Sequence, residues 1–257
     1  MTEVGTVAQL WRYPVKSFQG EPVEELAIGP GGADGDRILA VVDPGAKKVL
    51  SAKRYADLLL ASARLDGTRV VLTLPDGSEH ASDDAGVHDA LSSWLGMPVR
   101  LEPPPTDEVF PMEMYTGMSD EDSPLFDWPG PPGTWLDLAD SHWVTTASLA
   151  TIAGEHPDGE WDVRRFRPNG LIETAAEGYP EEGWPTFELG EVQVEVLMPT
   201  MRCSMPSRAQ PGLERDKAIG TTIRDANSNN LGVYARVTRG GTVRVGDSVH
   251  STQHPAP

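Results

Sequence analysis

The sequence has one cysteine, few basic side chains and no long apolar run. A single thiol cannot form an internal disulfide bond. No stretch of about 18 apolar residues is present, so no membrane-spanning helix is predicted. The first ten residues lack the basic and apolar regions of a secretion signal. Together these absences predict a soluble cytoplasmic protein without a membrane partner.

Positive charge is scarce, with 21 Lys and Arg against 39 Asp and Glu and a net charge of −18. Nucleic-acid-binding surfaces normally show clustered Lys and Arg, so no nucleic-acid partner is expected. The exception is the run Arg164-Arg165-Phe166-Arg167. Three guanidinium groups this close repel one another unless an anion or a carboxylate neutralises them.

Two common kinds of site are not indicated. No His-Glu-x-x-His motif and no pair of histidines one helical turn apart occurs among His80, His88, His142, His156, His250 and His254. The sequence therefore does not predict a zinc site. The glycine-rich stretch 31–36 is interpreted as a turn rather than a dinucleotide-binding loop, because no helix is expected after it.

Short strands and turns dominate the pattern. Strands are expected over 7–13, 23–28, 38–42, 143–145 and 161–167, and hairpins over 60–74, 187–197 and 233–245. Helices are expected over about 83–95 and 147–154, with one helical turn after 220. Many short strands with few helices predict a β-barrel or sandwich core with small helical additions.

Residues 102–133 differ from the rest of the chain. They contain eight prolines together with several Met and aromatic residues. No regular structure is expected there. The Met and aromatic content favours a loop folded over a site over a free linker.

The lone cysteine, Cys203, lies in the stretch 199–206 directly after Arg202. It can be a buried apolar side chain, a nucleophile or a metal ligand, and the last two are favoured by a neighbouring cation. Further cations, hydroxyls and one amide occupy predicted loops or strand ends: Lys16, Ser17, Arg37, Arg54, Thr145, Thr146, Ser148, Arg165, Arg167 and Asn169. Each alone has a structural explanation as a surface charge or a helix cap. Jointly they describe a pocket for a phosphate and a polar ring system, with helix N–H groups after Thr146, guanidinium groups and Asn169 as the binding groups.

These residues also carry a resemblance to a known family. The stretches 10–17 and 35–37 resemble the N-terminal part of MOSC proteins, which are named after the C-terminal domain of molybdenum cofactor sulfurases. The stretches 146–149, 164–169, 202–203 and 245–247 resemble the MOSC domain itself. The matches follow the family's order and extend over nearly the whole chain.

The resemblance implies a mainly β fold with small helices, in which a MOSC β-barrel (135–257) is joined through a Pro-rich loop (101–134) to a smaller β-rich N-terminal domain (1–100). It also implies a molybdenum cofactor (Mo-molybdopterin) between the two domains. Cys203 would be the metal ligand and a catalytic residue, with Tyr234 and Asp247 near the metal. The cofactor would be bound by Lys16, Ser17, Arg37, Thr146, Ser148, Arg165, Arg167, Asn169 and Arg202.

The function implied by the resemblance is reduction of hydroxylamines, amidoximes or N-hydroxylated bases, with electrons from a separate ferredoxin- or flavoprotein-type donor. Two alternatives stay open: a cofactor carrier or sulfur-transfer protein, and a pathway-specific enzyme with altered chemistry in the same pocket. Reductases of the family often have Pro-Cys-Thr-Arg-Cys where this chain has Pro-Thr-Met-Arg-Cys at 199–203. Substrate selection is assigned to the stretches 102–133 and 204–220, because neither is predicted to be part of the framework.

Overall fold

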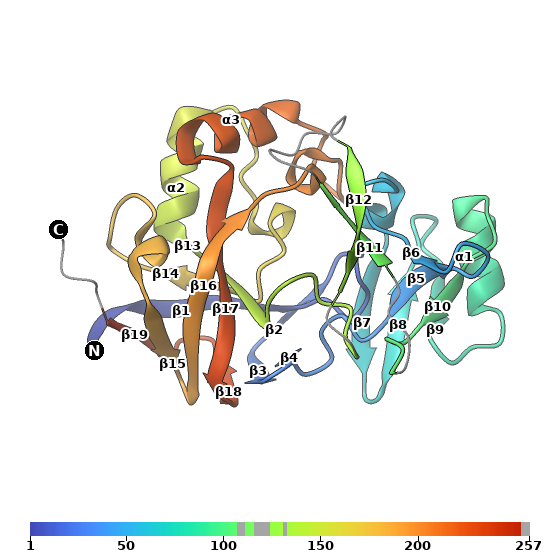
Figure 1. Cartoon of the computed structure of the whole chain (residues 1–257), viewed down its shortest axis with the longest axis horizontal. Coiled ribbons are helices and arrows are strands. Elements are labelled where there is room, and N and C mark those ends of the chain that lie inside the picture. The colour runs from blue at the N-terminus through green and yellow to red at the C-terminus, as the bar shows by residue number, and fades with distance from the viewer. Residues whose placement is uncertain (107–110, 116–123, 131–132, 253–257) are drawn as a thin grey trace.

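Seven strands close into a barrel around one apolar core. The computed structural model describes residues 1–106, 111–115, 124–130 and 133–252. The barrel order is β14 (Gly170–Glu173), β13 (Ser141–Thr145), β17 (Asn230–Arg239), β16 (Val192–Met201), β15 (Thr186–Leu189), β19 (Ser248–Thr252) and β1 (Thr2–Arg12), which pairs again with β14 (Figure 1). The predicted β-barrel core with small helical additions is confirmed.

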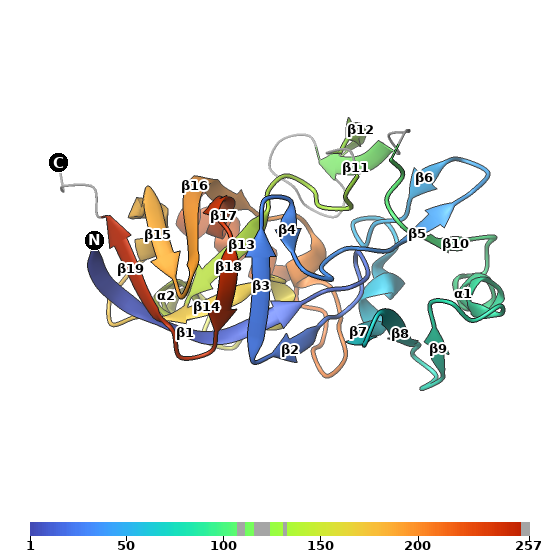
Figure 2. The same cartoon turned by 90° about the horizontal axis from the view of Figure 1, so that it is seen from below.

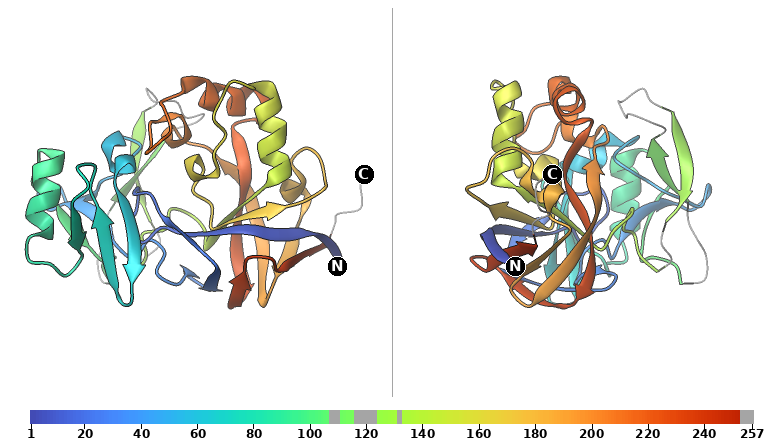
Figure 3. Two further views of the ribbon diagram at one scale, coloured as in Figure 1. Left: turned by 180° about the vertical axis from the view of Figure 1, so that it is seen from behind. Right: turned by 60° about the vertical axis from the view of Figure 1, so that its left-hand side comes forward.

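The first strand of the chain belongs to this barrel. β1 is antiparallel to β14 along one edge and to β19 along the other, and in Figure 3 it runs across the other strands of the barrel. A Cβ at Gly5 would lie 2.1 Å from the carbonyl oxygen of Glu173, so only glycine permits this approach. Residues 2–12 thus supply a barrel strand. The predicted boundary at residue 100 places the same residues in the N-terminal domain. The boundaries themselves stay a prediction.

Shorter strands form the smaller part of the molecule and its connections, as Figure 2 shows. β2 (Glu21–Val23) pairs with β1. β18 (Gly241–Arg244) pairs with β3 (Glu25–Gly29), which also pairs with β4 (Gly32–Ala33). The remaining sheets are β10 (Arg100–Glu102) with β5 (Ala40–Asp43) and β6 (Lys48–Val49), β7 (Ser62–Asp66) with β8 (Arg69–Thr73) and β9 (Glu79–Ala81), and β11 (Pro111–Tyr115) with β12 (Leu125–Pro129).

The described part of the chain has α-helices at α1 (Val87–Leu95), α2 (Thr146–Glu155) and α3 (Lys217–Asn227), with 3-10 turns at η1 (Ala56–Leu60), η2 (Val163–Arg165), η3 (Pro180–Gly183) and η4 (Met205–Ser207). α2 and α3 lie together beside one end of the barrel, whereas α1 lies on the smaller part of the molecule (Figure 1). No helix in the described ranges is long and apolar enough to cross a membrane.

Two apolar cores stabilise the two halves. In the barrel, the rings of Trp143 and Phe187 meet edge to face at 6.0 Å, and both side chains are fully buried. The smaller part has its own core, which contains Phe18, Leu58 and Leu72. Each half therefore buries a separate set of large side chains, and polar residues occupy the space between them.

Three local predictions are wrong. Residues 161–167 do not form a strand, because the Asp162 carboxylate accepts from the N–H of Arg164 and begins a 3-10 turn there. β17 and β18 do not form a hairpin, since β18 pairs with β3 instead. The helix after Asp216 starts earlier and is longer than one turn, because the Asp216 side chain caps α3 through the N–H of Ala218.

The Pro-rich stretch contains more regular structure than expected. β11 and β12 pair along their full lengths within 102–133, where no strand was predicted. Met112 is buried against Trp135, so the cross-strand pairs have an apolar anchor. The stretches 107–110, 116–123 and 131–132 lie outside the described residues.

Candidate functional site

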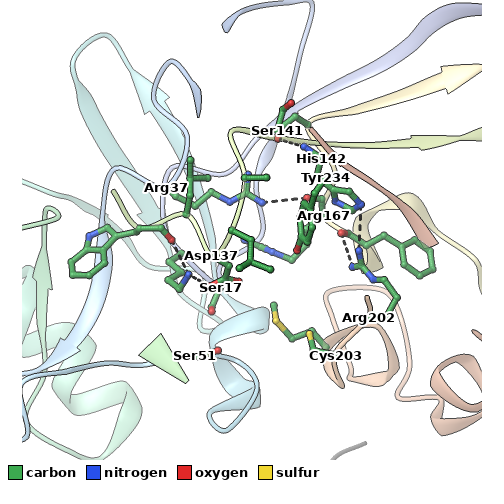
Figure 4. A pocket seen from close by; sticks show the side chains of 18 residues that line it. Ser17, Arg37, Ser51, Asp137, Ser141, His142, Arg167, Arg202, Cys203 and Tyr234 are labelled. Carbon is green, nitrogen blue, oxygen red and sulfur yellow. Dashed lines mark hydrogen bonds and ion pairs between the residues drawn. The ribbon is translucent and has the colours of Figure 1, made fainter. Parts of the chain in front are cut away.

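One pocket between the barrel and the smaller part collects most of the residues singled out from the sequence (Figure 4). Its lining includes eight of them: Lys16, Ser17, Arg37, Arg167, Asn169, Arg202, Cys203 and Tyr234. They come from the loop after β1, the loop after β4, the turn after η2, the end of β16 and strand β17. Residues far apart in sequence thus meet at one point.

Backbone conformation marks the same place. Six non-glycine residues of the described chain have positive φ, and three of them line the pocket: Ser17 at 69°, Arg37 at 50° and Arg167 at 56°. The left-handed region costs an L-residue on the order of 1–2 kcal/mol. Such strain persists only where surrounding contacts impose it, and it gathers at functional sites.

A buried carboxylate, Asp36, organises the arginine side of the pocket. Its Oδ2 accepts from the guanidinium of Arg37 and, at 3.1 Å, from Nδ2 of Asn169, and its Oδ1 accepts from the N–H of Tyr13 at 2.8 Å. The oxygen of the Asn169 amide accepts from the N–H of His142 at 3.1 Å. One N–H and the oxygen of the Asn169 amide are therefore already bonded within the protein, although this amide was predicted to bind a heterocycle. The ion pair with Asp36 outweighs the effect of burial and raises the pKa of Arg37.

On the opposite side, two buried lysines share another carboxylate. Nζ of Lys16 donates to Oδ1 of Asp137 at 2.6 Å and to the carbonyl oxygen of Trp135 at 2.7 Å. Nζ of Lys53 lies 3.8 Å from Oδ2 of Asp137. Burial lowers the pKa of Lys16, which Asp137 partly offsets. Burial raises the pKa of Asp137, but the two ammonium groups outweigh it and hold that pKa below its usual range.

Next to Cys203, Arg202 contacts two uncharged groups. Its guanidinium donates to the carbonyl oxygen of Phe166 at 2.8 Å and lies 3.3 Å from Nε2 of His142. Arginine can only donate, so Nε2 of His142 is the acceptor and the imidazole is neutral. Burial, and then the charge of Arg202, lower the pKa of His142 well below its ordinary value. The ring of Tyr234 lies 5.4 Å from that of His142, and burial raises the pKa of its phenol.

Thr146 and Ser148 are not brought to this pocket. The start of α2 holds the protein's own carboxylate: both oxygens of the buried Glu181 accept from the hydroxyl of Ser148 at 2.7 Å, and Oε2 accepts from Thr145 at 2.7 Å. Thr145 is the cap residue, and the hydroxyl of Thr146 accepts from the N–H of Thr174. An internal anion thus occupies the helix end at which a phosphate was expected.

Arg165 and Asp247 also lie outside the pocket lining. Arg165 is 1% exposed, and its guanidinium donates to the carbonyl oxygens of Glu160, Pro206, Arg208 and Glu214. It therefore fixes the loop that follows Cys203. Asp247 accepts from the N–H of Arg244 in the turn before β19.

The sequence interpretation missed four residues around the pocket. Asp36 lies inside the quoted stretch 35–37, so that motif contained a signal for it. Asp137 and Lys53 resemble any other loop charge in the sequence, and His142 is a single histidine in a buried strand. Within the described ranges, no three His, Cys, Asp or Glu side chains are grouped to hold a metal ion between them.

A β-barrel beside a smaller β-rich part, with a basic, cysteine-containing pocket between them, defines the class of this protein as a two-part β-barrel protein. Family models agree: the MOSC N-terminal beta barrel domain matches residues 4–93 and the MOSC domain matches residues 138–250. The chain belongs to the MOSC family.

Similar proteins carry related names. Mitochondrial amidoxime-reducing component 1 of Homo sapiens is 27% identical over 97% of this chain and 84% of the relative. The molybdenum cofactor sulfurase of Danio rerio is 25% identical over 89% of this chain and 31% of that protein. Among solved structures, the YuaD protein of Bacillus subtilis matches over 97% of both chains with 14% identity and a TM-score of 0.47.

Proposed function

We propose that this protein holds a molybdenum cofactor in the pocket and reduces small N-oxygenated substrates, namely hydroxylamines, amidoximes or N-hydroxylated bases. The observation that carries the proposal is that the only cysteine, Cys203, lines the same pocket as four inward-facing cations, Lys16, Arg37, Arg167 and Arg202. The relatives named as amidoxime-reducing components support the choice of substrate class.

The donor set fits an anionic cofactor. Among the residues that the structure describes, five cationic side chains, with Lys53 included, and two carboxylates, Asp36 and Asp137, lie in or beside the pocket. The described part of the pocket thus has more cationic than anionic side chains, although the net charge of the chain is −18. Guanidinium and ammonium groups bind phosphate oxygens, and a soft thiolate suits molybdenum bound to other sulfur ligands. When bound, the cofactor supplies a two-electron reduction that, with two protons, converts N–OH to N–H and water.

The chain's own residues have separate tasks in this proposal. Cys203 would hold the metal through Sγ, and the cation of Arg202 lines the same pocket directly before it in the chain. Asn169 retains one amide N–H for the ligand, and Lys16 and Ser17 contact the ligand from the other side. Tyr234 remains protonated at neutral pH because its pKa is raised, so its hydroxyl can donate a hydrogen bond into the pocket.

The stretches 102–133 and 204–220 are proposed to select the substrate. Met205, within 204–220, lines the pocket. The loop after 133 contributes Leu136 and Leu138 beside it, and this loop directly follows the Pro-rich stretch 102–133.

The proposed partner is a separate electron donor of the ferredoxin or flavoprotein type, because one cysteine cannot hold an iron–sulfur cluster. The proposed location is the cytoplasm, where a free thiol stays reduced.

The test is to express the chain with ample molybdate and to measure both its metal content and its dithionite-driven reduction of benzamidoxime and hydroxylaminopurine. About one molybdenum per chain with turnover is expected for the wild type, and loss of both is expected for Cys203→Ser. Met201→Ala is the matched control, since Met201 is 61% exposed and two residues away. Unchanged turnover in the Ser variant would refute the proposal. Bound cofactor without turnover would favour a carrier or sulfur-transfer protein.

A further inference from the structure

Two guanidinium groups of the pocket lie against one aromatic ring. Cζ of Arg37 is 4.6 Å, and Cζ of Arg167 is 4.4 Å, from the centroid of the Tyr13 ring. Tyr13 is 1% exposed, so the contacts are shielded from water. Cations within about 6 Å of a ring centroid are attracted to its π face, and most strongly where they are desolvated.

The two arginines need such compensation because they repel each other. Burial, and then the charge of Arg37, lower the pKa of Arg167 to about 10. Arg37 has the buried carboxylate of Asp36 as its partner. Among the described residues, no carboxylate lies within ion-pair distance of Arg167, whose guanidinium donates to the carbonyl oxygen of Phe18. The ring of Tyr13 is thus a close source of negative potential for this cation.

The backbone of Tyr13 is tied to the same cluster. Its N–H donates to Oδ1 of Asp36 at 2.8 Å, and its carbonyl oxygen accepts from the N–H of Arg37 at 2.7 Å. These two bonds set the ring position relative to a residue that has positive φ. Tyr13 therefore fixes both the local backbone and the charged ends.

The phenol hydroxyl of Tyr13 takes no part in these contacts. It is buried and has no hydrogen-bond partner in the described part of the chain. Burial raises the pKa of this phenol above its ordinary value, so the hydroxyl stays neutral. The contribution of the side chain to the cluster is accordingly that of the ring itself, which phenylalanine would supply equally well.

We propose that Tyr13 is a positioning residue whose π face holds the guanidinium groups of Arg37 and Arg167 side by side, facing the pocket, so that both can bind one phosphate group. The inference rests on the anion-binding role proposed above. It differs from a simple packing role in one respect. Packing depends on the volume of the side chain, whereas cation binding depends on the electron density of its ring.

The experiment varies electron density at nearly constant volume. Tyr13 is replaced by phenylalanine and by singly, triply and fully fluorinated phenylalanine, and binding of inorganic phosphate to the cofactor-free full-length chain is measured by calorimetry. Phenylalanine is expected to leave the affinity within about twofold of wild type. Each further step of fluorination is expected to weaken binding, by about tenfold for the fully fluorinated ring. The same substitutions at Tyr55, which packs against the separate core of the smaller part, are the control. They are expected to leave the phosphate affinity unchanged.

The outcomes separate this inference from the proposed function. A flat fluorination series at Tyr13, with phosphate still bound by the wild type, would overturn the role of Tyr13 and leave the pocket's function intact. Absence of phosphate binding by the wild type would overturn the anion-binding pocket and this inference together. Circular dichroism of each variant checks that the fold is retained, and the phenylalanine variant provides the folded reference.

Discussion

Replacing Asp137 with asparagine tests the electrostatic balance of the pocket. Asparagine keeps an oxygen that can accept from Lys16 and removes only the charge. Lys16 and Lys53 have side chains that are 8% and 6% exposed, and they would lose the carboxylate that faces both. Removing one partner of a buried ion pair costs about 3–5 kcal/mol. Since the Asp137 side chain is 32% exposed and partly solvated, we expect a loss of about 2–3 kcal/mol.

The loss should depend on pH in a defined direction. The folded-state pKa of Asp137 is depressed, so its contribution is present above its unfolded pKa of about 3.9 and is lost as the pH falls through the folded value. Urea unfolding of wild type and Asp137→Asn should therefore differ at pH 7 and converge in acid. Inorganic phosphate should stabilise the variant more than the wild type, because it can replace the missing anion.

Asp127→Asn is the matched control. Asp127 pairs with Lys48 at 2.8 Å, but the two side chains are 53% and 38% exposed, and such a pair contributes less than about 1 kcal/mol. Equal losses in the two variants, or a loss in Asp137→Asn that does not change with pH, would show that Asp137 is an ordinary surface charge.

Three further predictions concern the surroundings of the pocket. Burial raises the pKa of Glu181, so the stability it contributes is present below its unfolded pKa and is lost as the pH rises. In urea unfolding, Glu181→Gln should therefore become more stable relative to the wild type as the pH rises above the unfolded pKa of about 4.3. Arg165→Met should speed proteolysis of the 204–216 loop, because Arg165 binds three of its carbonyl oxygens. Arg164→Met should speed it less, because Arg164 binds the loop through the carbonyl oxygen of Pro211 alone. His142→Gln, with an oxygen available to Arg202, should retain cofactor better than His142→Leu, and equal metal contents would contradict this.

Strain and charge together indicate how the pocket is maintained. Ser17, Arg37 and Arg167 adopt positive φ, and two of them also bring like charges together in a buried place. These costs are offset by specific contacts, chiefly those of Asp36 and Tyr13, rather than by the apolar cores. The pocket is therefore expected to be less tolerant of substitution than the barrel core.

Much of the fold could be predicted from the sequence because its signals are local. The hairpins predicted over 187–197 and 60–74 are confirmed as β15–β16 and β7–β8. The Pro-rich stretch was misjudged, because pairing of β11 with β12 depends on Met112 packing against a residue beyond the strands. The 161–167 segment was misjudged for a different reason, since the local cap of Asp162 on the N–H of Arg164 begins a 3-10 turn there.

The sequence by itself determined the kind of pocket: one thiol, a few cations in an acidic chain, and motifs in the order of a known family. Only the tertiary structure decided which of those cations face inward. Thr146 and Ser148 lie at a helix end occupied by Glu181, and Arg165 supports a loop, while Asp36, Asp137, His142 and Tyr13 complete the site. The physical reason is that the role of a charged side chain depends on its partners, and one partner of Arg167 is 149 residues away in the chain.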